Sequence, residues 1–224
     1  MKAHINENLK KIKAELPQNV KIVAVSKTKP VEDIFIAYQL GYKAFGENKV
    51  QEILKKHEQL PKDIEWHFIG HLQRNKVKQL IPFIYLIHSV DSMRLLEKIN
   101  EEAKSFGNII NCLLQIHIAS EESKFGFSKE ELVQLLPSPE LKSLQNIRLC
   151  GLMGMASFTD NVDLIRKEFA YIHTLFKDIQ KEYLNDNKHF RELSIGMSGD
   201  YKIAVELGST IVRIGTGIFG ERNY

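Results

Sequence analysis

Short apolar runs alternate along the chain with longer segments in which apolar residues recur at helical spacing. The first helical segment shows this most clearly, because Ile5, Leu9, Ile12 and Leu16 form one apolar stripe that ends before Pro17. Strand-length runs followed by helical segments are typical of βα units around a parallel sheet. The pattern predicts helices at 2–16, 30–40, 47–57, 72–80, 92–104, 128–136 and 162–183, and strands at 20–25, 42–45, 65–69, 83–88, 111–118, 147–152, 192–195 and 210–214.

Eight strands, most of them with a following helix, match the count of a (β/α) barrel. Residues 1–224 are therefore expected to form one α/β domain, an eight-stranded parallel TIM-like barrel with an additional N-terminal helix. The eighth closing helix is expected to be missing, and the N-terminal helix is expected to cover the gap. An open, doubly wound sheet is the competing architecture.

The composition is that of a packed globular protein, with 43% hydrophobic residues, 26% charged residues and a net charge of +3. A charge this small, spread over the whole chain, gives no sign of nucleic-acid binding. No segment has the ~20 apolar residues of a membrane span, and the N-terminus lacks a secretory signal. Cys112 and Cys150 lie in apolar runs and are expected to be buried free thiols. We therefore expect a cytoplasmic protein with no membrane partner.

Three polar segments follow predicted strands one, seven and eight, at 26–30, 196–200 and 213–220. Because strand one neighbours strand eight in a closed barrel, these segments are expected to converge at the active end. The loops after strands seven and eight are also where such barrels bind phosphate groups. These segments offer hydroxyl donors at Ser198 and Thr216. They also contain glycines that let the backbone approach an anion closely, at Gly199, Gly215 and Gly217. The alternative is that these glycines only form tight turns.

Lys27 follows the apolar run Ile-Val-Ala-Val and is expected to lie on the same side as Val23 and Val25. A lysine drawn toward an apolar interior has a lowered pKa, and its neutral amine can condense with a carbonyl. Lys29 would add repulsion in the same direction if its charge pointed inward. The alternative is a strand-end lysine that reaches to water. Beside a phosphate site, such a lysine favours a pyridoxal phosphate site or a Schiff-base aldolase acting on a sugar phosphate.

Seven ordered motifs make the sequence similar to the pyridoxal-phosphate homeostasis proteins, also called the proline-synthase co-transcribed family, whose barrel resembles the N-terminal domain of alanine racemase. The resemblance covers nearly the whole chain. The motifs are Ala-Val-Ser-Lys-Thr-Lys-Pro (24–30), Phe-Gly-Glu-Asn-Lys-Val-Gln-Glu (45–52), Trp-His-Phe-Ile-Gly (66–70), Leu-Gln-Arg-Asn-Lys (72–76), Gly-Leu-Met-Gly-Met (151–155), Leu-Ser-Ile-Gly-Met-Ser (193–198) and Val-Arg-Ile-Gly-Thr-Gly-Ile-Phe-Gly (212–220).

The resemblance implies a role for each of several residues. Lys27 would hold pyridoxal 5'-phosphate as an internal aldimine, and Asn48 would lie beside the cofactor ring. Ser198, Gly215 and Thr216 would hold the phosphate. The protein would then supply or buffer the cofactor without amino-acid turnover, with pyridoxal-phosphate-dependent enzymes as candidate recipients. The alternative is a racemase-like enzyme or a Schiff-base aldolase.

Arg213 decides what such a cofactor could do. By similarity to alanine racemase it would face the pyridine nitrogen, and a guanidinium can only donate there, so that the ring would be a weak electron sink. Alanine racemase also has a second domain that supplies a tyrosine base, and no such segment follows Tyr224 here. A two-base racemase is therefore not expected. The alternative is an arginine that pairs with a surface carboxylate.

Other polar residues receive simpler interpretations. His67, His88 and His117 are expected to be hydrogen-bonded interior histidines, and no metal site is expected. The basic stretch from Arg74 to Lys78 is interpreted as a solvated helix face rather than a site for a second phosphate or for nucleic acid. Lys124 is interpreted as a mobile surface lysine, with a secondary lysine that relays the aldehyde as the alternative.

Overall fold

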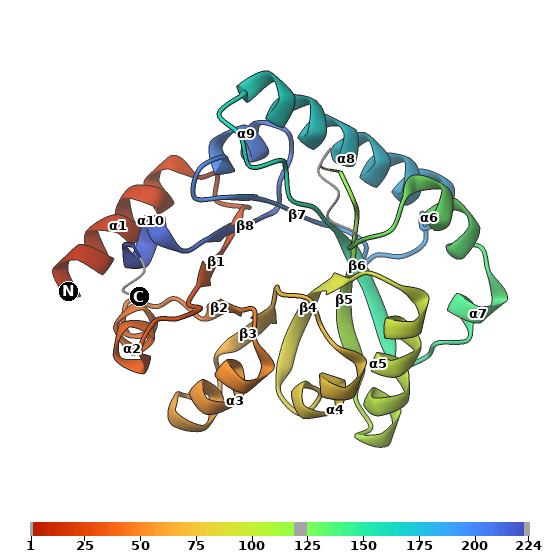
Figure 1. The fold of residues 1–224 in the computed structure, drawn as a ribbon, viewed down its shortest axis with the longest axis horizontal. Coiled ribbons are helices and arrows are strands. Elements are labelled where there is room, and N and C mark those ends of the chain that lie inside the picture. Colours follow the sequence, from red (N-terminus) through yellow and green to blue (C-terminus); the bar gives the residue numbers. More distant parts are fainter. Residues whose placement is uncertain (1, 119–124, 222–224) are drawn as a thin grey trace.

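The computed structural model describes residues 2–118 and 125–221. Its eight parallel strands close into a barrel in which neighbours in sequence are neighbours in space (Figure 1). Strand β8 pairs with β1 from Lys21↔Ile211 to Ala24↔Ile214, so the barrel prediction is confirmed and the open sheet is wrong. The strands are β1 (Lys21–Val25), β2 (Ala44–Glu47), β3 (Glu65–Phe68), β4 (Ile84–Val90), β5 (Ile110–Gln115), β6 (Ile147–Met153), β7 (Glu192–Met197) and β8 (Ile211–Ile214).

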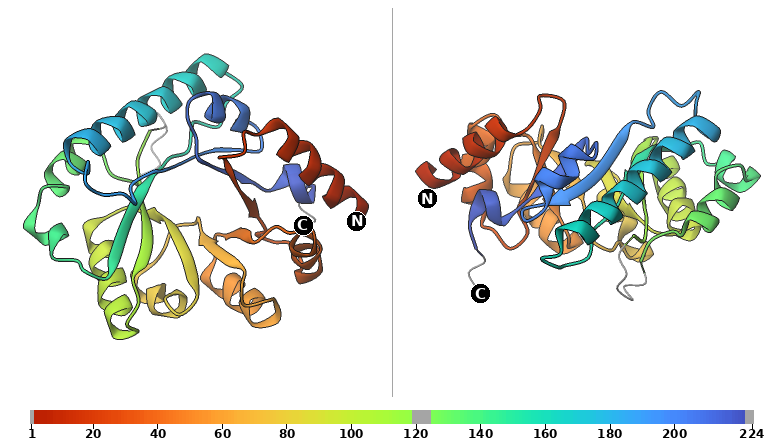
Figure 2. Two further views of the ribbon diagram at one scale, coloured as in Figure 1. Left: turned by 180° about the vertical axis from the view of Figure 1, so that it is seen from behind. Right: turned by 90° about the horizontal axis from the view of Figure 1, so that it is seen from above.

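The helices lie outside the ring of strands, as the two further views show (Figure 2). Three of them were not predicted, because elements of four to six residues are too short to show helical periodicity: α7, α9 and α10. Within the described residues, no helix combines the length and apolar character needed to cross a membrane. The helices are α1 (Lys2–Glu15), α2 (Val31–Gln39), α3 (Val50–Gln59), η1 (Arg74–Lys76), α4 (Val77–Leu80), α5 (Met93–Ser105), α6 (Lys129–Leu135), α7 (Pro139–Lys142), α8 (Val162–Glu182), α9 (Tyr201–Glu206) and α10 (Thr216–Phe219).

The N-terminal helix covers the seam where the barrel closes. Helix α1 lies beside α10 and α2, and its predicted stripe of Ile5, Leu9 and Ile12 is buried (Figure 1). Asn8 Nδ2 also donates to the carbonyl of Ile218 at 3.1 Å. The expectation that the eighth helix is missing is wrong, because α10 follows β8. It has only four residues, however, and α1 supplies the apolar cover that a longer eighth helix would give.

A second, smaller apolar cluster is separate from the larger hydrophobic core. It includes Val23, Leu86, Leu113 and Ile211. Cys150 belongs to the same cluster, and burial raises the pKa of its thiol to about 11. Cys112 and Cys150 are both buried free thiols, as predicted.

We predict that α1 contributes substantially to the stability of the barrel. Replacing Leu9 with alanine should lower the free energy of unfolding by about 2–5 kcal/mol, because a fully buried side chain leaves a cavity. Urea denaturation measures this change. The neighbouring Lys10 is exposed, and Lys10→Ala should change the stability by less than about 0.5 kcal/mol. Equal effects of the two variants would contradict the packing role of α1.

Candidate functional site

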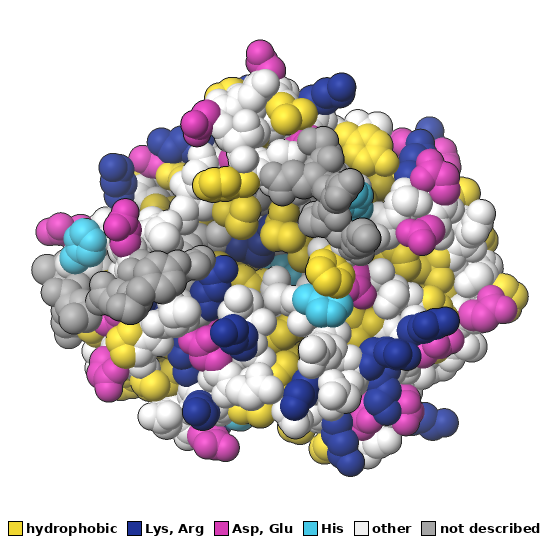
Figure 3. Space-filling view, viewed as in Figure 1, with side chains coloured by type: hydrophobic (Ala, Val, Ile, Leu, Met, Phe, Trp, Pro, Cys, Tyr) yellow, Lys and Arg dark blue, Asp and Glu magenta, His cyan; other side chains and the backbone are white. Residues whose placement is uncertain are grey.

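The three predicted segments meet at the carboxyl-terminal mouth, the end of the barrel where the strands finish. Ser198, just after β7, accepts hydrogen bonds at its Oγ from the backbone N–H groups of Gly215 and Gly217, just after β8. The chain after β1 reaches the same place, because Lys29 Nζ donates to the carbonyls of residues 219–221 at 2.6–3.1 Å. Figure 3 shows this face, which is hollowed near its centre and has lysine or arginine side chains in the hollow. The predicted convergence is confirmed.

The backbone N–H groups of Gly215 and Gly217 form a pair of donors with spare capacity. Each lies 3.3 Å from Ser198 Oγ, which is longer than a good N–H···O bond, so the hydroxyl satisfies both only weakly. A side chain on Gly217 would bring its Cβ to 3.0 Å from Ile214 Cγ2, so there is little room for one at this position. Thr216, between the two glycines, is exposed. An anion with several oxygens would match these donors better than one hydroxyl does.

Lys27 lies in a tight turn rather than at the end of the strand. The turn is closed by a hydrogen bond from Lys29 N to Ser26 O at 3.0 Å, and Lys27 is half-buried within it. Thr28 has φ +65°, a left-handed conformation that is rare for a β-branched residue and costs about 1–3 kcal/mol. The direction of Lys27 is therefore set by this strained turn and not by strand alternation. Lys29 does not point toward Lys27 to repel it, since its ammonium is bound at the carbonyl end of α10.

A buried ionic cluster holds this turn in place through hydrogen bonds. Lys56 Nζ donates to Glu47 Oε1 at 2.8 Å, to Glu52 Oε1 at 2.7 Å and to the Ser26 carbonyl at 2.8 Å. Ser26 Oγ donates to Glu47 Oε1 at 2.6 Å, and the backbone N–H of Thr28 donates to Glu52 Oε1 at 2.6 Å. We call Ser26, Glu47, Glu52 and Lys56 the Lys56 cluster. Every member contacts either the turn or a residue that holds it.

The charges of the Lys56 cluster are withdrawn from water. Glu47 is fully buried and Lys56 is 5% exposed. Burial raises the pKa of Glu47, while Lys56 and the Ser26 hydroxyl act in the opposite direction. Sequence reasoning missed this cluster. The spacing of four residues between Glu52 and Lys56 was a signal for an ion pair on a helix, but such pairs are usually exposed.

Asn48 directly follows β2 and is half-buried. The loop after β3 packs closely against its backbone, and a Cβ placed on Gly70 would lie 2.3 Å from the Asn48 carbonyl oxygen. Only glycine allows this approach, so Gly70 fixes the position of Asn48 at the mouth.

Arg213 lies inside the barrel and is 3% exposed. Its Nη1 donates to both the carbonyl and the Oγ of Ser194 at 2.7 Å, and its Nη2 donates to the Gly154 carbonyl at 2.9 Å. Burial lowers the pKa of the guanidinium to about 10, with Asp200 opposing the shift. The alternative of an arginine paired with a surface carboxylate is wrong. Three of its five N–H groups are used by these bonds, and two remain.

A chain of interior hydrogen bonds continues from Arg213. Ser194 Oγ lies 2.9 Å from His88 Nδ1, and His88 Nε2 lies 2.8 Å from His67 Nδ1. We call Arg213, Ser194, His88 and His67 the interior chain. Burial lowers the pKa of His67 to about 3 and that of His88 well below its ordinary value, so both rings are neutral.

The remaining predicted residues divide as follows. His67 and His88 are hydrogen-bonded interior histidines, as expected, but His117 is exposed, because it lies beyond the end of β5 where the barrel no longer covers it. Arg74 and Lys78 are exposed, in agreement with a solvated face. Lys124 lies outside the described residues.

The fold and the site define a (β/α) barrel with a half-buried lysine and a pair of weakly satisfied amides at its carboxyl-terminal mouth. The family described as alanine racemase, N-terminal domain, matches residues 2–223. A pyridoxal phosphate homeostasis protein of Aquifex aeolicus is 42% identical over 205 residues, which are 91% of this chain and 88% of the relative. A protein of the same name from Pasteurella multocida is 39% identical over 228 residues, 99% and 96% of the two chains.

A solved structure gives the same result. PipY of Synechococcus elongatus with PLP bound is similar with a TM-score of 0.88 at 35% identity, over 96% of this chain and 100% of PipY. The chain therefore belongs to the family of pyridoxal phosphate homeostasis proteins, whose barrel is of the alanine racemase N-terminal type.

We predict that removing the cation of the Lys56 cluster destabilises the folded protein. Lys56→Met should lower the free energy of unfolding by about 3–5 kcal/mol, because Glu47 would be left as a buried, uncompensated charge. The exposed neighbour Lys55 provides the control, and Lys55→Met should have little effect. Adding Glu47→Gln to Lys56→Met should recover part of the loss. No recovery in the double variant would contradict a penalty that comes from the unpaired carboxylate.

We also predict a histidine contribution to acid unfolding. His67 has a pKa of about 3 in the folded chain, whereas an unfolded histidine titrates near its ordinary value of about 6.5. The unfolded state therefore binds more protons between these values, and stability falls as the pH falls, by about 1.4 kcal/mol per pH unit for one histidine. Between about pH 4 and pH 6, His67→Phe should make the fall shallower by this amount. The exposed His4, replaced in the same way, should leave the slope unchanged.

Proposed function

We propose that the chain binds pyridoxal 5'-phosphate at its carboxyl-terminal mouth and supplies or buffers it without turning over amino acids. The main support is that the turn bearing Lys27 lies at the same end of the barrel as the Ser198, Gly215 and Gly217 donors. PipY, 35% identical, is a relative described with PLP bound. Pyridoxal-phosphate-dependent enzymes of the cytoplasm are the proposed recipients.

The donor set fits the phosphate group. In our proposal Ser198 and the backbone N–H of Gly215 hold it together with Thr216. The two amides are 3.3 Å from the serine hydroxyl and can turn to a stronger acceptor. Charge-assisted hydrogen bonds from N–H groups to phosphate oxygens are shorter and stronger than bonds to a neutral hydroxyl. The exposed Thr216 hydroxyl adds a third group at the same place.

Lys27 supplies the covalent attachment in this proposal. Its neutral amine would condense with the cofactor aldehyde, with loss of one water. The strained turn and the Lys56 cluster hold the lysine in one position, so little conformational entropy is lost when the bond forms. Asn48, fixed by Gly70, would lie beside the ring.

Arg213 limits the chemistry of the bound cofactor. Pyridoxal phosphate supplies an aldehyde and a ring that withdraws electrons strongly only when its nitrogen is protonated. Arg213 has two N–H groups left after its bonds to Ser194 and Gly154, and a guanidinium has no acceptor. Facing the pyridine nitrogen, it would donate to it and keep it unprotonated. This supports binding and delivery over carbanion chemistry.

We predict that borohydride fixes one pyridoxyl phosphate per chain on Lys27. Mass spectrometry of the peptides identifies the residue and the stoichiometry together. Lys27→Ala should abolish the labelled peptide, whereas the exposed Lys49→Ala should keep it. A label on another lysine in the unchanged protein would overturn the proposed attachment.

Protein loaded with pyridoxal phosphate but not treated with borohydride distinguishes delivery from catalysis. Incubated with amino acids in deuterated water, the loaded protein should exchange no α-protons at an enzymatic rate. Exchange that depends on Lys27 would favour a racemase-like enzyme, and retro-aldol cleavage of hydroxy amino acids or sugar phosphates would favour a Schiff-base aldolase.

A further inference from the structure

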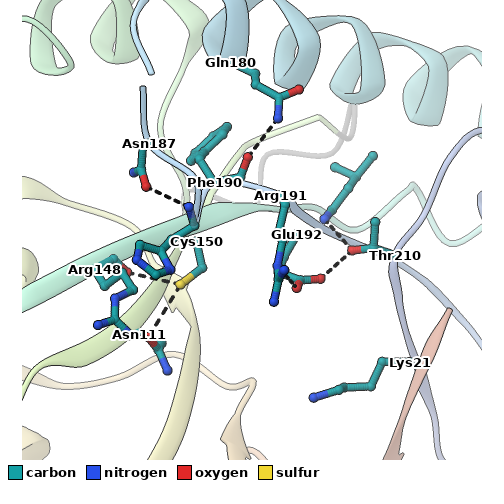
Figure 4. A network of polar contacts seen from close by, with 12 residues as sticks. Lys21, Asn111, Arg148, Cys150, Gln180, Asn187, Phe190, Arg191, Glu192 and Thr210 are labelled. Carbon is teal, nitrogen blue, oxygen red and sulfur yellow. Dashed lines mark hydrogen bonds and ion pairs between the residues drawn. The ribbon is translucent and has the colours of Figure 1, made fainter. Parts of the chain in front are cut away.

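A second polar cavity opens at the amino-terminal mouth, the end of the barrel where the strands begin. Its volume is about 140 Å³, and its lining comes from the first residues of several strands. Figure 4 shows Lys21 reaching in from β1 on one side, while Asn111 and Arg148 project from β5 and β6 on the other, with Arg191 and Glu192 between. Lys27 and Ser198 follow the last residues of β1 and β7, so this cavity is at the opposite end of the barrel.

Positive charge dominates the cavity. Lys21, Arg148 and Arg191 line it with a single carboxylate, Glu192. Glu192 is engaged already, by Arg191 at 3.5 Å and by the Thr210 hydroxyl at 2.8 Å. Lys21 is paired with Glu65 at 3.1 Å.

Arg148 is the cation that lacks a counter-charge. Its hydrogen bond goes to the neutral Asn111 Oδ1 at 3.3 Å, and no carboxylate among the described residues pairs with it. Its half-buried guanidinium is therefore available to an anion.

The inner wall of the cavity presents a hydrogen-bond donor, as the interior chain shows. Arg213 can only donate, so Ser194 Oγ accepts from it. If His88 also donated to Ser194, the buried serine hydroxyl would have no acceptor for its own proton. Ser194 therefore donates to His88 Nδ1, which puts the His88 proton on Nε2, from where it is donated to His67 Nδ1.

The last proton of the chain consequently lies on His67 Nε2. This nitrogen is buried and has no hydrogen-bond partner among the described residues. His67 is one of the residues that line the cavity, and its Nδ1 is occupied by His88. A buried N–H without an acceptor is costly, and an acceptor that entered here would relieve that cost.

We propose that this cavity binds a tetrahedral oxyanion of phosphate size, held by Arg148 and Lys21 and accepting a hydrogen bond from His67 Nε2. The volume is sufficient for an ion of this size. The cavity is open to solvent beside the partly exposed Tyr85, so the oxyanion is either free or the end group of a small molecule.

Calorimetric titration of inorganic phosphate into the chain, with pyridoxal phosphate first fixed by borohydride, tests the proposal. We expect one phosphate per chain. Arg148→Gln and Lys21→Gln should each weaken binding by about tenfold or more, since each removes a charge-assisted hydrogen bond. The control is Arg94→Gln, which removes an exposed arginine near the start of α5 at the other end of the barrel and should leave the affinity unchanged.

The variant Ser198→Ala distinguishes phosphate bound in this cavity from phosphate bound at the carboxyl-terminal mouth. The test therefore remains valid even if the protein binds no cofactor. Phosphate binding that is lost in Ser198→Ala and retained in Arg148→Gln would place the ion at the other mouth and overturn the proposal, as would no binding at all. Titration with glycerol phosphate compares the two sources: tighter binding than phosphate indicates an end group, and weaker binding indicates the free ion.

Nitrogen NMR of the imidazole rings gives a second readout that does not depend on affinity. Both His67 and His88 should be protonated at Nε2, and phosphate should shift the His67 Nε2 resonance in the unchanged protein but not in Arg148→Gln. A proton on His67 Nδ1 would overturn the donor assignment.

Discussion

Pairing between the first and last strands is the constraint on which the rest of this structure depends. Strands β1 and β8 are separated by most of the sequence, and their four register pairs turn a sheet with two open edges into a closed barrel. Closure brings the turn that bears Lys27 beside the Gly215 and Gly217 amides, and Lys29 joins the two segments directly. The short α10 leaves this seam thinly covered, which makes α1 part of the architecture rather than an appendage.

Strain and buried charge are concentrated around one lysine. Thr28 in a left-handed conformation and Lys56 among two carboxylates both cost free energy, and both lie within hydrogen-bond reach of the same turn. Neither feature improves the packing of the barrel. Local cost that the rest of a fold must offset is typical of functional sites. The arrangement is explained if the orientation of Lys27 matters more than the stability of the loop that carries it.

The sequence was informative where chemistry depends on order along the chain, and less so where it depends on contacts between distant residues. Eight apolar runs were enough for the barrel, and the segments around Lys27, Ser198 and Gly215 could be brought together because closure follows from the strand count. The Lys56 cluster could not be predicted, because its members come from β2, α3 and the turn after β1. Nothing in the sequence pattern shows that a lysine on a helix surface is buried. The same limitation explains Lys29, whose partners are about 190 residues away along the chain. Helix α10 was too short to give a periodic signal.

The polar interior gives both mouths of the barrel the same preference. Arg213 cannot accept a hydrogen bond, so every bond from it through Ser194 and His88 to His67 must run in one direction. Donors are therefore left over at both ends of this chain of bonds: two N–H groups of Arg213 at one end and His67 Nε2 at the other. Replacing Arg213 with a residue that accepts hydrogen bonds would reverse the direction of donation along the interior chain. Both ends of the chain would then be acceptors. The choice of arginine at position 213 thus favours acceptors at both ends of a single line of buried hydrogen bonds.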